Sequence, residues 1–257
     1  MRGILHTSGP RPGKYAPLRP IQLMNSNSSL PAAVIFDMDG VLVNSNPFHL
    51  RKWVELLREH GIPFEEEKLA EIVLGPPNEV TFQRYFGHLT PEEMHKLSEE
   101  LEARFRQTIG PHARPLPGVV RLLDECRANG MTMAVASAAI SRNVNFIITA
   151  LKLRPYFRTV LSVNEITHAK PDPEIYLKTA AKLGVKPSAC VVCEDSFVGI
   201  AAAKAAGMKC LAIASTFPID DLRRETAADR VVPSFEGVTL ATLRGLFDGA
   251  TAPAGHH

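Results

Sequence analysis

A short apolar run that ends abruptly at two acids constrains the fold of this chain more than any other feature. Residues 32–36 read Ala-Ala-Val-Ile-Phe, and Asp37, Asp39 and Gly40 follow at once. An unbroken apolar run of this length is typical of a strand buried on both faces of a parallel sheet. In such sheets, ligands bind outside the carboxyl ends of the strands. The pattern therefore places Asp37 and Asp39 where a ligand site is expected.

The chemistry of this acid pair has two interpretations. Like charges one residue apart raise the pKa of one carboxyl group or recruit a metal ion, so that one carboxylate is free to act as a nucleophile while the other carries a proton. An acidic turn after a strand, with Gly40 supplying the backbone freedom, explains the same residues without any function. The motif alone leaves both interpretations open.

Size and composition are those of a globular protein with a sizeable core. The 257 residues are 45% hydrophobic and 22% charged, which suits one large domain or two smaller ones. The net charge of +2 gives no reason to expect nucleic acid or a membrane surface as a partner. Cys126, Cys190, Cys193 and Cys210 have no second pair or histidine that completes a zinc site. We expect buried, reduced thiols in a cytoplasmic protein.

The pattern of strands and helices divides the chain into five parts. Residues 1–31 are predicted to be a disordered extension and residues 248–257 a tail. Residues 47–114 carry only helical patterns, whereas residues 32–46 and 115–247 alternate between strands and helices. Alternation at this spacing predicts right-handed strand–helix–strand units. The expected fold is α/β, a Rossmann-like parallel sheet flanked by helices, with an inserted all-helical cap domain.

One helix of the predicted cap has a specific start signal. Thr90 stands at the N-cap position, Pro91 at the first helical position, and Glu93 where a capping box needs an acid. The helix is expected to run to about Gln107.

Polar groups that are far apart in sequence are expected to meet at one edge of the sheet. The first strand ends at Asp37 and Asp39, a second ends at Ser137, and a later one ends at residues 194–196, Glu-Asp-Ser. Lys170 stands just before a helix that starts with proline. Because the carboxyl ends of parallel strands share one edge, these groups suit a single phosphate site.

With these motifs the chain resembles the haloacid dehalogenase superfamily, and specifically its β-phosphoglucomutase-like branch of phosphatases and mutases. The resemblance covers roughly residues 33–247. It rests on four motifs in chain order: Asp37-x-Asp39-Gly40-Val-Leu-x-x-Ser45, Ser137, Lys170-Pro-Asp-Pro, and Glu194-Asp195-Ser-x-x-Gly199-Ile. It implies a Mg²⁺-dependent phosphatase that hydrolyses a small phosphorylated metabolite, a sugar or polyol phosphate, through an aspartyl-phosphate.

The resemblance also implies catalytic and phosphate-binding roles. Asp37 would attack phosphorus, and Asp39 would protonate the leaving alkoxide and later take a proton from water. Lys170 would neutralise charge on both the phosphoryl group and Asp37. Ser137 and the backbone N–H groups that follow it, beginning with Ala138, would bind the phosphoryl oxygens.

A further set of implied roles concerns the cofactor and the substrate. Mg²⁺ would be held by Asp37, the backbone carbonyl of Asp39, and Asp195, with Glu194 acting mainly through a metal-bound water. His49 matches a position at which the mutases carry a histidine that contacts the substrate. A surface histidine on the first cap helix is the other interpretation of His49.

A β-phosphoglucomutase-type mutase is the first alternative. Mutases of this branch carry a lysine just before a cap glycine and an arginine soon after, and these grip a second phosphate. Leu74 and Asn78 stand at about those positions here, and Arg51 or Arg84 are the remaining candidates for such a grip. The substitutions favour a monophosphate hydrolase.

Other activities fit less well. A dehalogenase has no use for an acid at Asp39, and a phosphonate hydrolase needs a cap lysine in a supporting motif, which Lys52 and Lys68 lack. A non-catalytic protein that binds a phosphorylated ligand remains a more remote alternative, although all four motifs are retained. We expect a monomer with a small-molecule substrate and no nucleic-acid or membrane partner.

Overall fold

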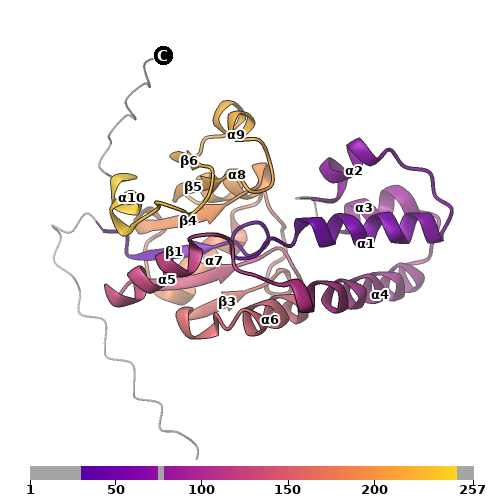
Figure 1. Ribbon diagram of the computed structural model, residues 1–257, viewed down its shortest axis with the longest axis horizontal. Coiled ribbons are helices and arrows are strands. Elements are labelled where there is room, and N and C mark those ends of the chain that lie inside the picture. Colours follow the sequence, from indigo (N-terminus) through magenta and orange to yellow (C-terminus); the bar gives the residue numbers. More distant parts are fainter. Residues whose placement is uncertain (1–29, 75–77, 248–257) are drawn as a thin grey trace, which may run out of the picture.

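Six parallel strands form the centre of the molecule (Figure 1). The computed structural model describes residues 30–74 and 78–247. The strands are β1 (Ala33–Phe36), β2 (Thr132–Ala136), β3 (Thr159–Leu161), β4 (Cys190–Glu194), β5 (Lys209–Ile213) and β6 (Arg230–Val232). Their order in the sheet is β3-β2-β1-β4-β5-β6, and every neighbouring pair is parallel. The predicted parallel α/β sheet is confirmed.

Strand β1 is buried on both faces, as its unbroken apolar run predicts. Val34 and Phe36 belong to the apolar cluster on one face of the sheet, and Ala33 and Ile35 to the cluster on the other face. All four side chains are fully buried. Burial on two faces needs apolar residues at every position, which is why this strand shows no alternation.

Helices cover both faces of the sheet. They are α5 (Val119–Ala128), α6 (Ser141–Ala150), α7 (Glu174–Leu183), α8 (Phe197–Ala205), α9 (Ile219–Glu225) and α10 (Leu240–Gly245), with four 3₁₀ turns at Gly110–His112, Arg154–Tyr156, Val163–Glu165 and Pro187–Ala189. Side chains of α5, α6 and α10 pack in the cluster on one face, and those of α7, α8 and α9 in the cluster on the other. The sequence pattern does not indicate α9 or α10, because helices of seven and six residues are too short to show a period.

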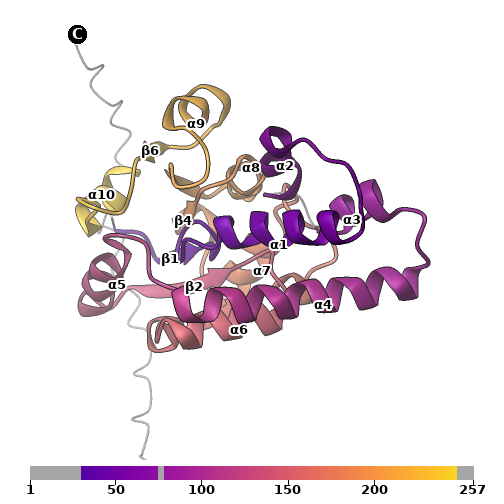
Figure 2. The same cartoon turned by 45° about the vertical axis from the view of Figure 1, so that its right-hand side comes forward.

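The chain leaves the sheet after β1 and forms a helical cap before it returns at α5. The cap helices are α1 (Asn46–Glu59), α2 (Glu66–Val73), α3 (Asn78–Phe86) and α4 (Pro91–Ile109). Figures 1 and 2 show them projecting from one side of the α/β unit, with α1 and α4 side by side. Their inward faces share an apolar core centred on Trp53, Phe82 and Phe86. The predicted helical segments are confirmed, and we keep 47–114 as the proposed limits of the cap domain.

Several smaller predictions can be compared with the structure. The four cysteines are buried and free, as predicted. The predicted disordered extension and tail lie outside the described residues, apart from Leu30 and Pro31. Within residues 30–74 and 78–247, no helix is both long and apolar enough to span a bilayer.

The predicted capping box at the start of α4 is confirmed and gives a stability test. The Thr90 hydroxyl accepts a hydrogen bond from the Glu93 N–H, and the Glu93 carboxylate accepts one from the Thr90 N–H at 2.8 Å. Thr90→Ala should lower the free energy of unfolding by about 1 kcal/mol, because the Glu93 N–H loses the hydroxyl that accepts its hydrogen bond. Urea denaturation measures this loss. Thr90→Ser keeps the hydroxyl and should retain most of the stability; an equal loss in both variants would contradict the capping role.

Candidate active site

Three buried carboxylates meet where the strand order reverses. Strands β1 and β4 are neighbours at the centre of the sheet, and their chain connections run to opposite sides. Asp37 directly follows β1, Glu194 is the last residue of β4, and Asp195 follows it. One oxygen from each carboxylate lies within 4.8 Å of the other two. This is the switch point of an open α/β sheet, the usual place for a ligand.

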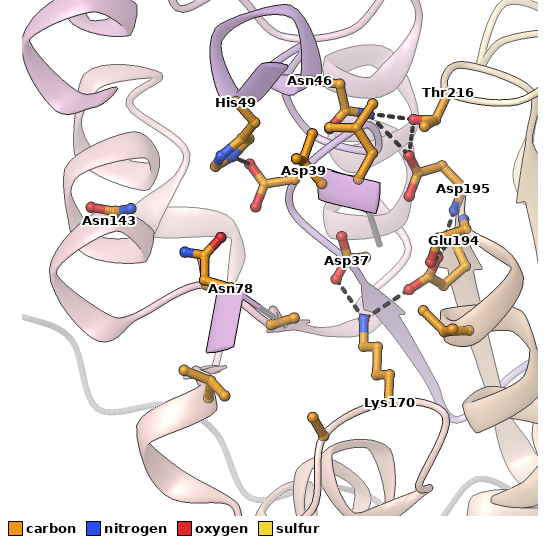
Figure 3. Close-up of a pocket in the computed structure, with 18 of the residues that line it drawn as sticks. Asp37, Asp39, Asn46, His49, Asn78, Asn143, Lys170, Glu194, Asp195 and Thr216 are labelled. Atoms are coloured by element: carbon orange, nitrogen blue, oxygen red, sulfur yellow. Dashed lines mark hydrogen bonds and ion pairs between the residues drawn. The ribbon is translucent and has the colours of Figure 1, made fainter. Parts of the chain in front are cut away.

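Lys170 joins two of these acids (Figure 3). It lies in the loop before α7, and its Nζ donates to Asp37 Oδ1 at 2.6 Å and to Glu194 Oε1 at 2.7 Å. Its side chain is buried. The structure therefore brings together Asp37, Lys170, Glu194 and Asp195, as the strand-end argument predicts.

The three buried acids differ in how their pKa values are shifted. Burial raises the pKa of Asp37 to about 7; the charge of Lys170 opposes this, while Glu194 and Asp39 add to it. Burial and the charges of Glu194 and Asp37 hold the pKa of Asp195 well above its usual value. Burial also acts to raise the pKa of Glu194, but the charge and hydrogen bond of Lys170 lower it overall. Lys170 carries one positive charge and pairs with two of the three carboxyl groups, so the fully ionised site would have an excess of negative charge.

Asp39 is tied to the cap. Its Oδ1 accepts a hydrogen bond from Ser45 Oγ at 2.5 Å and lies 3.2 Å from His49 Nε2 on α1 (Figure 3). The His49 ring stacks on Phe105 of α4, with 4.1 Å between the ring centroids. Partial burial acts to raise the pKa of Asp39, but His49 and Ser45 lower it below the usual value. Of the two acids in the motif, Asp37 holds a proton more readily.

A second set of residues orients Asp195 and Glu194. Asp195 Oδ2 accepts a hydrogen bond from Thr216 Oγ1 and a longer one, 3.5 Å, from Asn46 Nδ2. Glu194 Oε1 accepts from the Tyr176 hydroxyl at 3.0 Å. Sequence reasoning missed all three partners. Thr216 follows β5 closely, so the strand-end rule could have found it, whereas Asn46 and Tyr176 carry no comparable signal.

Ser196 is the N-cap residue of helix α8. Its hydroxyl accepts a hydrogen bond from the Gly199 N–H at 3.1 Å. Asp195, the residue before Ser196, lines the cavity. The Ser196 N–H in turn donates to Glu194 Oε2 at 2.8 Å.

Ser137 and Ala138 differ in whether they line the cavity. Both follow β2, and Ala138 lines the cavity together with Ala139. The Ser137 side chain is fully buried, and its hydroxyl accepts a hydrogen bond from the Ala139 N–H at 3.0 Å. It does not reach the cavity wall, so its predicted contact with phosphate stays a prediction.

The cavity between cap and core has a volume of about 150 Å³. Leu74 and Asn78 line it from the cap, while Lys170 and the acids line it from the core. Neither remaining candidate for a second phosphate grip lines it. Arg51 is exposed and pairs with Glu55 on its own helix, and Arg84 borders a separate hollow on the cap.

Two glycines allow the acids to pack closely. A Cβ on Gly40 would lie 1.8 Å from Asp195 Oδ2, and one on Gly199 would lie 1.7 Å from Glu194 Oε1. Gly40 also has a φ of +70°, in the left-handed region. The motif glycines thus leave room for the carboxylates.

Substitution of Gly40 can be compared with a matched glycine outside the site. Gly130 has the same φ of +70°, but a Cβ there would meet nothing within 4 Å. Alanine at either position should cost about 1–2 kcal/mol of backbone strain. Gly40→Ala should lower the free energy of unfolding further, because Asp195 must move. Urea titration of both variants measures the difference, and equal losses would show that the close approach to Asp195 is not a constraint.

Comparison with known proteins identifies the family. The model of the haloacid dehalogenase-like hydrolases matches residues 34–213, well over half of the chain. The chain therefore belongs to this family of enzymes.

Individual relatives agree with this assignment. Fructose-1-phosphate phosphatase YqaB of Escherichia coli (strain K12) is 31% identical over 69% of this chain and 93% of its own length. Beta-phosphoglucomutase of Bacillus subtilis (strain 168) is 29% identical over 82% of this chain and 93% of its own. The crystal structure of a haloacid dehalogenase hydrolase of family IA, variant 3, from Entamoeba histolytica has a TM-score of 0.78 and 25% identity, covering 84% of this chain and 99% of that one. The chain is thus an enzyme of the phosphoric monoester hydrolase type, in a branch that holds phosphatases and mutases.

Proposed function

We propose that this protein is a Mg²⁺-dependent phosphatase that hydrolyses a sugar or polyol phosphate through an aspartyl-phosphate on Asp37. The observation that carries the proposal is the buried group of Asp37, Glu194, Asp195 and Lys170 at the switch point of the sheet. Asp39 lies in the wall of the same cavity. A nucleophile, a proton-transfer group and a cation for the phosphoryl oxygens are therefore available together.

The acids suit a magnesium ion. Asp37, Glu194 and Asp195 offer only oxygen atoms, which Mg²⁺ prefers, and Lys170 leaves most of their charge uncompensated. In the proposed site Asp37, Asp195 and the Asp39 carbonyl would hold the ion, with Glu194 acting mainly through a metal-bound water. When bound, the ion supplies positive charge that lets a carboxylate approach the anionic phosphate ester.

Asp37 is the proposed nucleophile. Lys170 donates to its Oδ1, so Oδ2 is the oxygen free to attack phosphorus. Attack forms the aspartyl-phosphate and breaks the bond to the leaving alkoxide, and water then hydrolyses the acyl phosphate. The charge of Lys170 opposes the effect of burial on Asp37, but the pKa is still raised to about 7, and further positive charge would favour the ionised form that attacks phosphorus.

Asp39 is the proposed general acid and base. Ser45 and His49 both contact Oδ1, so Oδ2 is the oxygen available for proton transfer. His49 and Ser45 lower the pKa of Asp39, so in this scheme Asp39 takes up a proton as the negatively charged phosphate ester binds, gives it to the leaving alkoxide, and takes one from the attacking water in the second step. His49 acts in this scheme by holding Asp39 and forming part of the cavity wall.

Hydrolysis is favoured over the mutase reaction by the cap wall. Leu74 and Asn78 line the cavity at about the positions where the mutases carry cations. A second phosphate would lose charge-assisted hydrogen bonds there.

We also propose that the protein is monomeric and cytoplasmic, with a small phosphorylated metabolite as its partner.

A single assay separates the candidate functions. Purified protein is incubated with Mg²⁺ and sugar and polyol monophosphates, including β-glucose 1-phosphate with glucose 1,6-bisphosphate, and free phosphate and glucose 6-phosphate are measured in the same tubes. Phosphate release that EDTA abolishes supports the phosphatase. Glucose 6-phosphate with little free phosphate identifies a mutase, and neither product favours a protein that only binds a phosphorylated ligand.

Substitution of the two motif acids should separate their roles. Asp37→Asn should abolish turnover, because the amide is a poor nucleophile. Asp39→Asn should lower kcat by roughly 10²–10⁴-fold, because proton transfer is lost. Initial rates of phosphate release and the circular dichroism spectrum are measured for both. Asp220→Asn, at an exposed position, is the matched control, and near-normal activity in either motif variant would exclude the mechanism.

Binding of Mg²⁺ should release protons at neutral pH. The pKa of Asp37 is raised to about 7, so a fraction of this carboxyl group is protonated at that pH and must ionise when the metal binds. The apparent affinity should therefore rise as the pH passes through about 7, and Asp195 should add to the protons released because its pKa is also raised. Calorimetric titration in two buffers of different ionisation enthalpy counts the released protons. A pH-independent affinity without proton release would contradict the raised pKa.

A further inference from the structure

A second polar cluster lines the cavity opposite the catalytic acids. Asn78 of α3, Glu102 of α4 and Asn143 of α6 all border it. Figure 3 shows Asn78 and Asn143 across the cavity from Glu194 and Asp195. Glu102 is only 4% exposed, so it is a buried acid that the proposed chemistry does not use.

Glu102 is held at the centre of this cluster by hydrogen bonds. Its Oε1 accepts from Asn78 Nδ2 at 2.7 Å and from Lys52 Nζ at 2.5 Å, and its Oε2 accepts from Asn143 Nδ2. Arg106 Nη1 donates to Asn143 Oδ1 at 2.5 Å. Burial acts to raise the pKa of Glu102, but the charge and hydrogen bond of Lys52 lower it, so the group is a carboxylate.

The negative group of this cluster lines the cavity, whereas its positive groups do not. Lys52 and Arg106 hold Glu102 and Asn143 but do not line the cavity, whereas the carboxylate and the two amides do. Among the described residues that line it, Lys170 is the only lysine or arginine. A second phosphate or a carboxylate on the leaving group would therefore meet the Glu102 carboxylate at the cavity wall, with the cations that pair with this cluster, Lys52 and Arg106, placed behind it.

The cluster keeps unused acceptors for hydroxyl groups. A carboxylate can accept about four hydrogen bonds, and three donors are bonded to Glu102. No residue in the described ranges donates to Asn78 Oδ1. A neutral polyhydroxy alcohol can donate its O–H groups to these atoms, and a site built for such bonds discriminates strongly against ligands that lack them.

We propose that Asn78, Glu102 and Asn143 form the site that recognises the leaving alcohol and selects neutral polyhydroxy alcohols over anionic ones. This inference deepens the proposed phosphatase function and rests on it. The volume of about 150 Å³ restricts the leaving group to a small molecule. Because Glu102 belongs to the cap and Asn143 to the core, their hydrogen bond completes the recognition site only when cap and core lie together.

The test compares substrates that differ in charge but little in shape. Values of kcat/KM are measured for sorbitol 6-phosphate, its carboxylate analogue 6-phosphogluconate, and acetyl phosphate, whose leaving group has no hydroxyl. The wild-type enzyme should prefer sorbitol 6-phosphate over 6-phosphogluconate by about tenfold or more. Glu102→Gln should reduce that preference by about tenfold. Glu99→Gln, on the exposed side of the same helix, is the matched control and should leave it unchanged.

A second variant covers the case in which Glu102→Gln fails to fold, since it leaves Lys52 buried without its partner. Asn78→Leu keeps the Lys52–Glu102 pair and should lower the ratio of kcat/KM for sorbitol 6-phosphate to that for acetyl phosphate by about tenfold. A ratio within about twofold of wild type would overturn the recognition site. So would a wild-type enzyme that hydrolyses 6-phosphogluconate as well as sorbitol 6-phosphate. Absence of phosphate release from all three compounds would instead overturn the proposed phosphatase.

Discussion

The ion pairs between Lys170 and the acids at the ends of β1 and β4 are the interaction on which the site depends. Buried charges are costly unless they are paired and hydrogen-bonded. Lys170 Nζ lies 2.6 Å from Asp37 and 2.7 Å from Glu194, so one ammonium group allows two carboxylates to stand at neighbouring strand ends. Asp195 adds a third carboxylate that Lys170 does not contact directly. The remaining negative charge is what makes a divalent cation a physically sensible occupant.

The order of the strands brings the carboxylates together, and two glycines allow them to pack closely. Because β1 lies beside β4, acids from distant parts of the chain face one another at the switch point. Gly40 and Gly199 leave the space that the carboxylates of Asp195 and Glu194 occupy. The same residues that identify the family in the sequence are therefore required by the packing of the site.

The cap contributes to the site from two directions. Near the sheet, His49 contacts the Asp39 carboxylate and stacks on Phe105, which connects the proton-transfer group to cap packing. Across the cavity, Glu102 contacts Asn143 of the core. The cap thus forms walls with different chemistry around one small cavity. In the proposed mechanism the core supplies the reacting groups, while the cap supplies much of the contact with the leaving group.

The sequence by itself determined the parallel α/β fold, the helical cap, and the meeting of Asp37, Lys170 and the acids of residues 194–195. These follow from local patterns: apolar runs, helix caps and polar residues at strand ends. Only the tertiary structure showed that Glu102 lines the cavity and that Thr216 bonds Asp195. It also decided which acid of the motif holds a proton more readily. Those properties depend on which elements touch in space and on burial, and neither is encoded in the spacing of residues along the chain.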